Sequence, residues 1–388
     1  MQDDKLSPVG SAPLAQNLRR LRDEKGLSQA EVAQRAGISR VAYRNIETGE
    51  AAPRTATLSN LAATLGVKTA DLMTEVRTLQ AVRFRQKKMT SREQLLVRVS
   101  RWLEAYTELE DVLGDKPRFT FGKALGKVGS GGNKAERMAI AAREVVGLKP
   151  EEAIGDICRL LEENGVKVFP HVLASEAFFG LSVGKEDGGP AVVVNVWPRI
   201  TIERWIFTVA HELGHLLLHL DAYKVAEQEE NEAQEQAADV FGSHFLMPAP
   251  AFEREWQAAR GLPLVDRVMQ VKAAFRVSYR TVLHRVQDTT SLGKSVWERF
   301  QAQYKERYER ILDITEEPQG LKQAEPAMVE PHSGHEPDRL YQSEFTGARL
   351  NRLVREAIEK NLISLGRGAE ILGKDLSEMR KLVASWVE

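Results

Sequence analysis

The feature that most constrains this chain is the pattern His-Glu-x-x-His in residues 208–219. Apolar residues recur at helical spacing around the pattern, which predicts a helix. On that helix His211 and His215 lie one above the other, so both imidazoles can reach one metal ion. Glu212 lies about 100° round the helix from His211, beside the ion, where it can take a proton from an activated water molecule. The alternative is a structural helix with two incidental histidines.

A catalytic zinc ion needs a third protein ligand, and the acid-rich segment 227–241 offers candidates. The second part of this segment has helical spacing of its apolar residues, and Glu235 and Asp239 are one helical step apart. We select Glu235 as the ligand and keep Glu232 in reserve. We expect Asp239 to hold a ligand imidazole by a hydrogen bond. The other acids of the segment fit a solvated charge run.

Other polar side chains are weaker candidates for a role at the metal site. His219 shares the face of His215, but three histidines on one straight helix cannot readily surround one ion, so we expect a core or rim position. A second group should contact the oxyanion formed during hydrolysis. His171, His244 and Tyr279 are candidates, although each fits a structural role better.

Residues 14–76 contain five short helical patterns and predict an all-α domain. Ser28 and Glu31 form a capping-box pattern, and Ser39 begins the next short helix after a turn at Gly37. Two capped helices joined by a Gly-containing turn have the spacing of a helix-turn-helix, whose second helix enters the major groove of DNA. A small helical docking module is the alternative.

The candidate contacts with double-stranded DNA lie at the starts of these two helices. Ser28 and Gln29 begin the first helix, where backbone N–H groups favour a phosphate. In the second helix Val41 or Ala42 and Ile46 are expected to pack inward, while the polar residues project outward to reach guanine edges or phosphates. The six candidates are Ser28, Gln29, Ser39, Arg40, Tyr43 and Arg44.

These N-terminal motifs are similar to those of Cro/lambda-repressor-like (XRE) helix-turn-helix domains. The resemblance covers about residues 14–74 and rests on Leu27-Ser-Gln-x-Glu-Val-Ala-x-x-Ala-Gly-Ile-Ser39 and Ile46-Glu-x-Gly49. Such domains normally bind repeated half-sites as dimers. The resemblance therefore implies a homodimer.

The central motifs resemble those of the ImmA/IrrE metallopeptidases over roughly residues 150–290. The resemblance rests on Phe207-Thr208 with His-Glu-Leu-Gly-His-Leu-Leu-Leu-His, then Glu235-x-x-Ala-Asp, then Phe245-Leu-Met-Pro248. It implies a thermolysin-like zinc site with His211, His215 and Glu235 as ligands and Glu212 as the base. It also implies a protein substrate, often a helix-turn-helix repressor. Two positions depart from the family pattern: Ala237 stands where many members carry a second acid, and Ile206 where an Arg is common.

A chain of 388 residues is long enough for two or three domains. We expect a multidomain, mostly α protein with a central α+β, gluzincin-like domain, because strand patterns at 166–169, 178–183 and 191–196 precede the metal helix. An exposed edge among these strands could hold an extended peptide. The predicted division is 14–76, helix-turn-helix domain; 77–148, basic helical linker; 149–290, metallopeptidase domain; 291–314, helix; 315–338, loose linker; and 339–388, C-terminal helical, helix-turn-helix-like module.

Composition indicates the cell compartment in which the protein functions. One cysteine, Cys158, excludes a disulfide framework and suits a reducing compartment. No run approaches the roughly 18 apolar residues of a membrane span, and the N-terminus lacks a signal-peptide core. We therefore expect a cytoplasmic protein without membrane contact. A second metal site at His332 and His335 is the weaker interpretation of the loose linker.

The sequence thus predicts a DNA-binding transcriptional regulator that carries a zinc-dependent peptidase domain and cleaves a regulatory protein, such as a repressor. The alternative is an antitoxin-type DNA-binding regulator in which the metallopeptidase fold serves for docking or sensing a partner, such as a toxin, with little or no proteolysis. Glu212 favours the enzyme, because a site that only binds would not need a base there.

Overall fold

The computed structural model describes residues 11–73, 79, 82–84, 92–129, 131–175, 178–219, 231–309, 311–312, 336–338 and 340–386. The chain forms two compact units, one of residues 1–79 and 88–103 and the other of residues 80–87 and 104–388. The expected fold class is confirmed: the protein is multidomain and mostly helical, with a small sheet in the second unit. Within the described ranges, no helix is both long enough and apolar enough to cross a bilayer. The finer division into six segments stays a prediction, and His332 and His335 lie outside the described residues.

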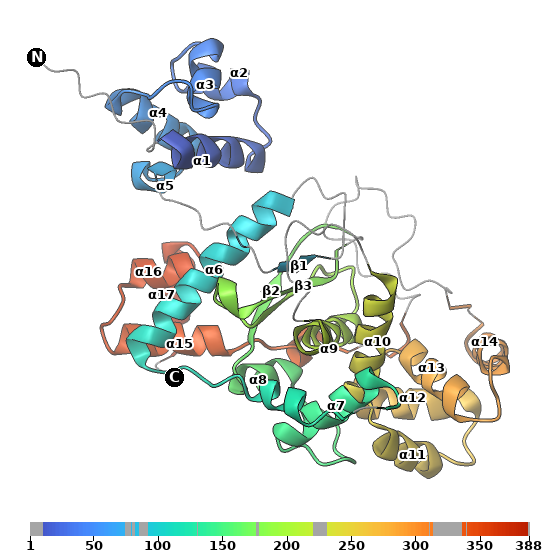
Figure 1. Ribbon diagram of the computed structural model, residues 1–388. Coiled ribbons are helices and arrows are strands. Elements are labelled where there is room, and N and C mark those ends of the chain that lie inside the picture. The colour runs from blue at the N-terminus through green and yellow to red at the C-terminus, as the bar shows by residue number, and fades with distance from the viewer. Residues whose placement is uncertain are drawn as a thin grey trace, which may run out of the picture. The chain divides into compact units, whose positions relative to one another are not determined.

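The first unit contains five short helices where five were predicted, labelled in Figure 1. Leu14, Leu18 and Leu21 on the first helix are buried, as expected from their spacing. The capping box at Ser28 is present, and the side chain of Ser39 caps the helix that follows it. The helices are α1 (Ser11–Glu24), α2 (Gln29–Arg35), α3 (Arg40–Glu47), α4 (Thr55–Leu65) and α5 (Thr69–Met73).

A four-stranded sheet of order β1-β3-β4-β2 forms the centre of the second unit. Its strands are β1 (Val82–Phe84), β2 (Lys167–His171), β3 (Gly180–Val183) and β4 (Ala191–Asn195). β2 pairs with β4 in parallel, and the other two pairs are antiparallel. Every residue of β3 and β4 is buried, so both faces of the central sheet are covered.

The predicted strand edge is not that of β3, because β1 and β2 are the outer strands of the sheet. The strand β1 pairs with the outer edge of β3, from Val82 opposite Val183 to Phe84 opposite Leu181. This strand was not predicted, because three residues in a basic segment carry too short a pattern to be recognised. The second unit thus covers an edge of its own sheet with a segment from the N-terminal half of the chain.

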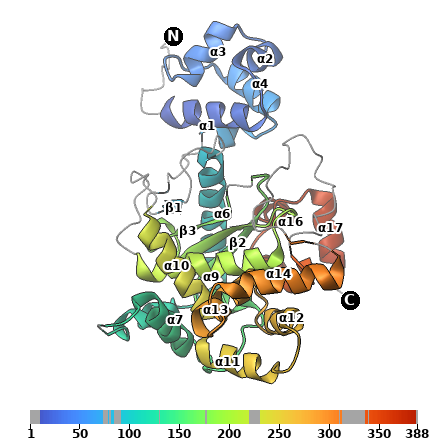
Figure 2. The ribbon, with the colours of Figure 1, turned by 90° about the vertical axis from the view of Figure 1, so that its right-hand side faces the viewer.

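The helix α9 (Ile202–Leu218) lies against this sheet, and α10 (Glu232–Leu246) packs beside α9 (Figure 1). Most of α9 is buried, which explains its apolar sequence. The helices α11 to α14 gather on the side of α9 and α10 that faces away from the sheet (Figure 2). Their bounds are α11 (Ala249–Ala258), α12 (Leu264–Phe275), α13 (Tyr279–Thr289) and α14 (Ser295–Tyr308), and two further helices of the unit are α7 (Lys134–Val145) and α8 (Ile157–Glu163).

The C-terminal helices also belong to the second unit. They are α15 (Arg349–Glu359), α16 (Leu365–Ile371) and α17 (Leu376–Ala384), and Gly368 allows α16 to approach Val354 and Met379 closely. The buried guanidinium of Arg349 donates to Glu110 Oε1 at 2.6 Å, on the second half of α6 (Arg92–Leu113). A buried ion pair therefore ties the C-terminal module to this helix.

Candidate functional site

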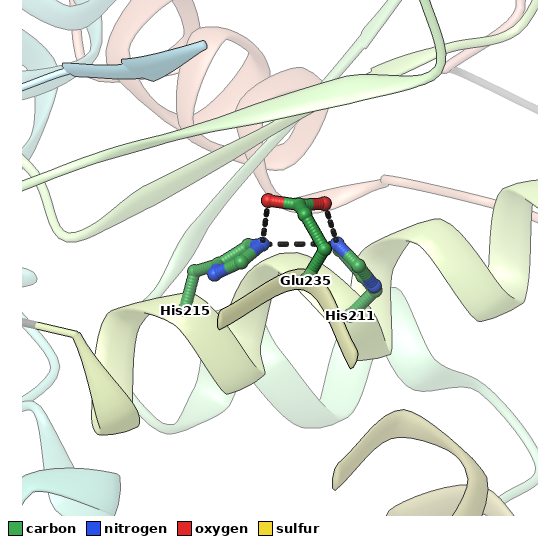
Figure 3. A group of neighbouring side chains, drawn as sticks. All are labelled: His211, His215 and Glu235. Carbon is green, nitrogen blue, oxygen red and sulfur yellow. Dashed lines mark hydrogen bonds and ion pairs between the residues drawn. The ribbon is translucent and has the colours of Figure 1, made fainter. Parts of the chain in front are cut away.

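Helices α9 and α10 bring together the three predicted metal ligands, His211, His215 and Glu235 (Figure 3). The Nε2 atoms of the two histidines lie 2.9 Å apart, and each lies 3.3 Å from one oxygen of the Glu235 carboxylate. Their donor atoms all fall within 4.8 Å of one another. The reserve candidate, Glu232, is instead exposed at the start of α10. The geometry thus favours Glu235 as the third ligand.

This set of donors fits a zinc ion. Two nitrogen atoms bound to tetrahedral zinc lie roughly 3.3 Å apart, close to the spacing of the three donors here. Burial opposes ionisation of Glu235, but its contacts with His211 and His215 outweigh burial and hold the pKa of the carboxyl far below its usual value. Two imidazoles and one ionised carboxylate are a ligand set that zinc commonly takes in hydrolytic sites.

Each ligand imidazole has a further partner at its other ring nitrogen. His211 Nδ1 lies 2.8 Å from Asp239 Oδ1, the arrangement predicted for Asp239. His215 Nδ1 lies 2.9 Å from His219 Nδ1. His219 therefore contacts a candidate ligand, as its i, i+4 spacing from His215 could have indicated. Such partners fix the orientation of a metal-binding imidazole.

Two glycines allow α9 and α10 to approach closely enough to form the cluster. A Cβ on Gly214 would lie 2.9 Å from Cδ1 of the buried Phe241 ring. A Cβ on Gly242 would lie 3.4 Å from the backbone nitrogen of His211. Gly214 thus makes room for the second helix, and this contact brings Glu235 within reach of the histidines.

Glu212, the expected base, is 4 % exposed and lies on the side of α9 that faces β3. A Cβ on Gly180, the first residue of β3, would lie 3.3 Å from Glu212 Cγ and 2.6 Å from Thr208 Cγ2. Only glycine therefore lets the strand pass so close to the helix. The carboxyl side chain that could move a proton thus lies beside the sheet.

The protonation of His211 is strongly affected by its surroundings. Burial lowers its pKa, but hydrogen bonds with Asp239 and Glu235 outweigh burial and raise the pKa to about 9. In the absence of an ion, His211 therefore holds a proton at neutral pH. A metal ion has to displace that proton, because a metal ligand must be a neutral imidazole.

The three side chains considered as oxyanion contacts each pack against neighbouring side chains. Tyr279 is 1 % exposed and stacks on Phe300, with ring centroids 5.4 Å apart. His244 lies beside Arg285, and His171 stacks on a neighbouring ring of β2. These contacts give each side chain a structural role. At the two positions that depart from the family pattern, Ile206 is buried in the core and Ala237 packs against it.

The first unit presents a different candidate surface, at the start of α3. Ser39, Arg40 and Arg44 are exposed, as predicted for contacts with DNA. Val41 is 67 % exposed, so of the two inward alternatives Ala42 is the one that turns toward the core. An exposed valine among arginines can contact a thymine methyl group.

The prediction that Tyr43 projects outward is wrong. Its side chain is fully buried, and its hydroxyl donates to Glu47 Oε1 at 3.0 Å. Arg22 Nε and Gln29 Nε2 donate to the same carboxylate at 2.6 and 2.5 Å. These bonds join α1, α2 and α3, because a buried charge must be satisfied by several donors. A carboxylate that belongs to the core was not expected from sequence spacing alone.

Together, the fold and the site define a helix-turn-helix protein with a second, α+β domain in which two helices bring two histidines and a glutamate together. Comparison with known families agrees with this class. A helix-turn-helix model matches residues 18–72, and the model of the IrrE N-terminal-like domain, of peptidase family M78, matches residues 162–287.

A curated relative supports the N-terminal assignment. The chain is 45 % identical over 58 residues to the uncharacterized HTH-type transcriptional regulator y4dJ of Sinorhizobium fredii (strain NBRC 101917 / NGR234). The matched stretch covers 15 % of this chain and 75 % of the relative. The chain therefore belongs to the XRE-type helix-turn-helix regulators and carries an ImmA/IrrE-like M78 domain.

Proposed function

We propose that this regulator binds operator DNA through its N-terminal domain and cleaves a regulatory protein through its M78 domain, with zinc as the cofactor. The observation that carries the proposal is the convergence of His211, His215 and Glu235 beside Glu212. These three ligands would hold the zinc ion. When bound, zinc lowers the pKa of water and polarises a peptide carbonyl.

The residues around the ligands have separate roles in this reaction. Glu212 accepts the proton of the attacking water and then delivers it to the leaving amine. Asp239 and His219 hold the two imidazoles in place through their Nδ1 atoms. The burial of Glu212 and of both ligand histidines limits the access of bulk water to the reacting groups.

The strand β3 is the element best placed to align a peptide, because it passes directly against Glu212 at Gly180. An extended peptide can add to a sheet through backbone hydrogen bonds. Since β1 pairs with this edge of β3, a peptide that adds there has to take the place of β1.

Binding of DNA is proposed to use the exposed start of α3, with Arg40 and Arg44 as the main contacts and Ser39 beside them. Ser28 is exposed at the start of α2, and its hydroxyl, which accepts from Glu31 N, can also donate to a phosphate. The amide of Gln29 donates to Glu47, so its role is to position the helices. A homodimer on two half-sites completes this proposal.

A second candidate function is favoured by the pairing of β1 with β3. If β1 stays in place, the edge of β3 beside Glu212 is not available to a peptide, and the M78 domain serves as a docking or sensing module of an antitoxin-type regulator. The two functions differ in turnover. The docking function needs the surface of the domain but not the carboxylate of Glu212.

The test uses the full chain, loaded with zinc, and the protein products of the adjacent genes as substrates. Fragments are identified by mass spectrometry, and binding to operator DNA is measured in parallel. We expect the wild-type chain to cleave a neighbouring regulator, and Glu212→Gln to abolish cleavage while binding DNA normally. Equal regulation by the wild type and Glu212→Gln, without fragments from either, would instead establish the docking function.

A further inference from the structure

A cavity of about 740 Å³ lies on the side of α10 that faces α13, apart from the cluster of metal ligands. Residues of α9, α10 and α13 line most of it, and Trp297 of α14 contributes to one wall. Asp239, which holds His211, also lines the cavity. The cavity is large enough for a small organic molecule.

The most informative side chain of this cavity is Arg285, which is only 5 % exposed. It donates to Ser243 Oγ at 3.1 Å and lies 3.4 Å from His244 Nδ1. Among the described residues, Arg285 forms no ion pair with a carboxylate, although a buried guanidinium is ordinarily paired. Two contacts also leave part of its five N–H groups for another acceptor.

The histidine beside Arg285 adds no second positive charge. Burial and the neighbouring guanidinium lower the pKa of His244 to about 4, so this imidazole is uncharged at neutral pH. Its Nδ1 atom can then accept a hydrogen bond from the guanidinium. Burial lowers the pKa of Arg285 to about 10, although the carboxylates of Glu136 and Asp288 act to raise it, so the guanidinium is charged under the same conditions.

The acids that line the cavity are committed to other partners or lie at its rim. Glu203 accepts from Lys272 at 2.7 Å, and Glu336 lies 3.4 Å from the same ammonium group. Asp239 is bound to His211, and Asp288 is exposed. No carboxylate of the described chain forms an ion pair with Arg285, although Glu136 and Asp288 are near enough to favour its charge.

Two further arginines line the same cavity, and one of them is oriented by aromatic rings. The guanidinium carbon of Arg204 lies 4.4 Å from the ring centre of Phe179 and 5.9 Å from that of Phe207. Stacking of this kind orders a guanidinium. Arg280 donates through Nε to Tyr279 and is 9 % exposed.

We propose that this cavity binds a small molecule that carries a carboxylate or phosphate group, with Arg285 as its main partner and Arg204 as a second one. A guanidinium matches the oxygens of either group with paired hydrogen bonds. The site is separate from the metal ligands and does not depend on peptidase activity. It gives this regulator a place to bind a small anionic effector next to Asp239.

Isothermal titration of the full chain tests this proposal, with sodium phosphate and sodium glutarate as probes at an ionic strength held constant with sodium chloride. We expect saturable binding of at least one probe, weakened about tenfold or more by Arg285→Gln. The control is Arg254→Gln, which removes an exposed arginine paired with Glu255 on α11 and should leave binding unchanged. The tighter probe identifies the preferred oxyanion.

Two results would overturn the proposal: neither probe binds saturably at millimolar concentration, or Arg285→Gln binds as tightly as the wild type. Circular dichroism establishes whether Arg285→Gln is folded. If it is not, Arg204→Gln decides, because this half-buried residue can be replaced with less disturbance. Weakened binding by that variant supports the proposal, and unchanged binding contradicts it.

Discussion

Asp239 Oδ1 lies 2.8 Å from Nδ1 of His211, and the opposite nitrogen of the same imidazole lies 3.3 Å from Glu235. One histidine is thus held between two carboxylates, both supplied by α10. This arrangement orients the imidazole and increases its basicity, which are the usual roles of an outer partner in a zinc site.

Removal of the charge of Asp239 should weaken zinc binding without abolishing it. We expect Asp239→Asn to lower the affinity for zinc by about 10- to 100-fold, the usual effect of losing an outer partner of a ligand histidine. The measurement is a competition titration with a zinc chelator. Glu232→Gln, an exposed change on the same helix, serves as the control and should bind zinc like the wild type.

The affinity for zinc should depend on pH through His211. The pKa of His211 is raised to about 9 in the metal-free protein, so a proton must leave when the ion binds. We expect the affinity to increase about tenfold per pH unit from neutral pH and to level off above about 9. In Asp239→Asn the levelling should begin at lower pH, and an affinity independent of pH would contradict this assignment.

The stability of the metal-free protein should show the opposite trend. A histidine whose pKa is higher in the folded state than its unfolded value of about 6.5 stabilises the fold fully below that value. This contribution is lost as the pH rises through about 9. Denaturant titrations between pH 6 and 10 should therefore show decreasing stability of the second unit, and saturating zinc should reduce this decrease.

Gly214 should tolerate no side chain. In Gly214→Ala the new Cβ would lie 2.9 Å from the buried ring of Phe241, so α9 and α10 must separate. Overpacking of this kind costs about 1–3 kcal/mol and should also weaken zinc binding, because Glu235 moves with α10. Thermal unfolding and zinc titration measure the two effects. Gly366→Ala is the control, since a Cβ there meets only Ser364 Oγ at 3.8 Å.

Substitution of the residues proposed to contact DNA and substitution of a core residue of the first unit should have different effects. We expect Arg40→Ala and Arg44→Ala to weaken binding to operator DNA by about 1–3 kcal/mol each if they read bases, without a change in melting temperature. Tyr43→Phe should instead lower the stability of the first unit, because it removes the bond to Glu47. Fluorescence anisotropy and thermal unfolding distinguish these outcomes, and an unchanged melting temperature in Tyr43→Phe would contradict the role of Tyr43 in the core.

Short-range patterns predicted much of this structure. The spacing of His211 and His215 placed both on one face of a helix, and the serines at 28 and 39 marked the starts of α2 and α3. Periodicity and capping depend on residues within one or two turns, so a sequence shows them directly. The grouping of Glu235 with the histidines required the spacing on a second helix as well.

Long-range contacts were harder to predict. The pairing of β1 with β3 joins residues about a hundred positions apart, and the acceptor role of Glu47 depends on side chains from three helices. The need for a glycine at position 214 also depends on another helix, because the ring of Phe241 leaves no room for a side chain there. Tyr43 was misplaced because a hydroxyl-bearing ring on a DNA-binding helix fits either the surface or a core with a polar partner.

The central claim is that His211, His215 and Glu235 hold one zinc ion. Zinc content of the purified full chain, measured by mass spectrometry of the metal after dialysis, tests it most directly. We predict about one zinc ion per chain in the wild type and in Glu232→Ala, and a loss of most of the bound zinc in Glu235→Ala. Equal zinc content in the wild type and in Glu235→Ala, with both proteins folded, would contradict the claim.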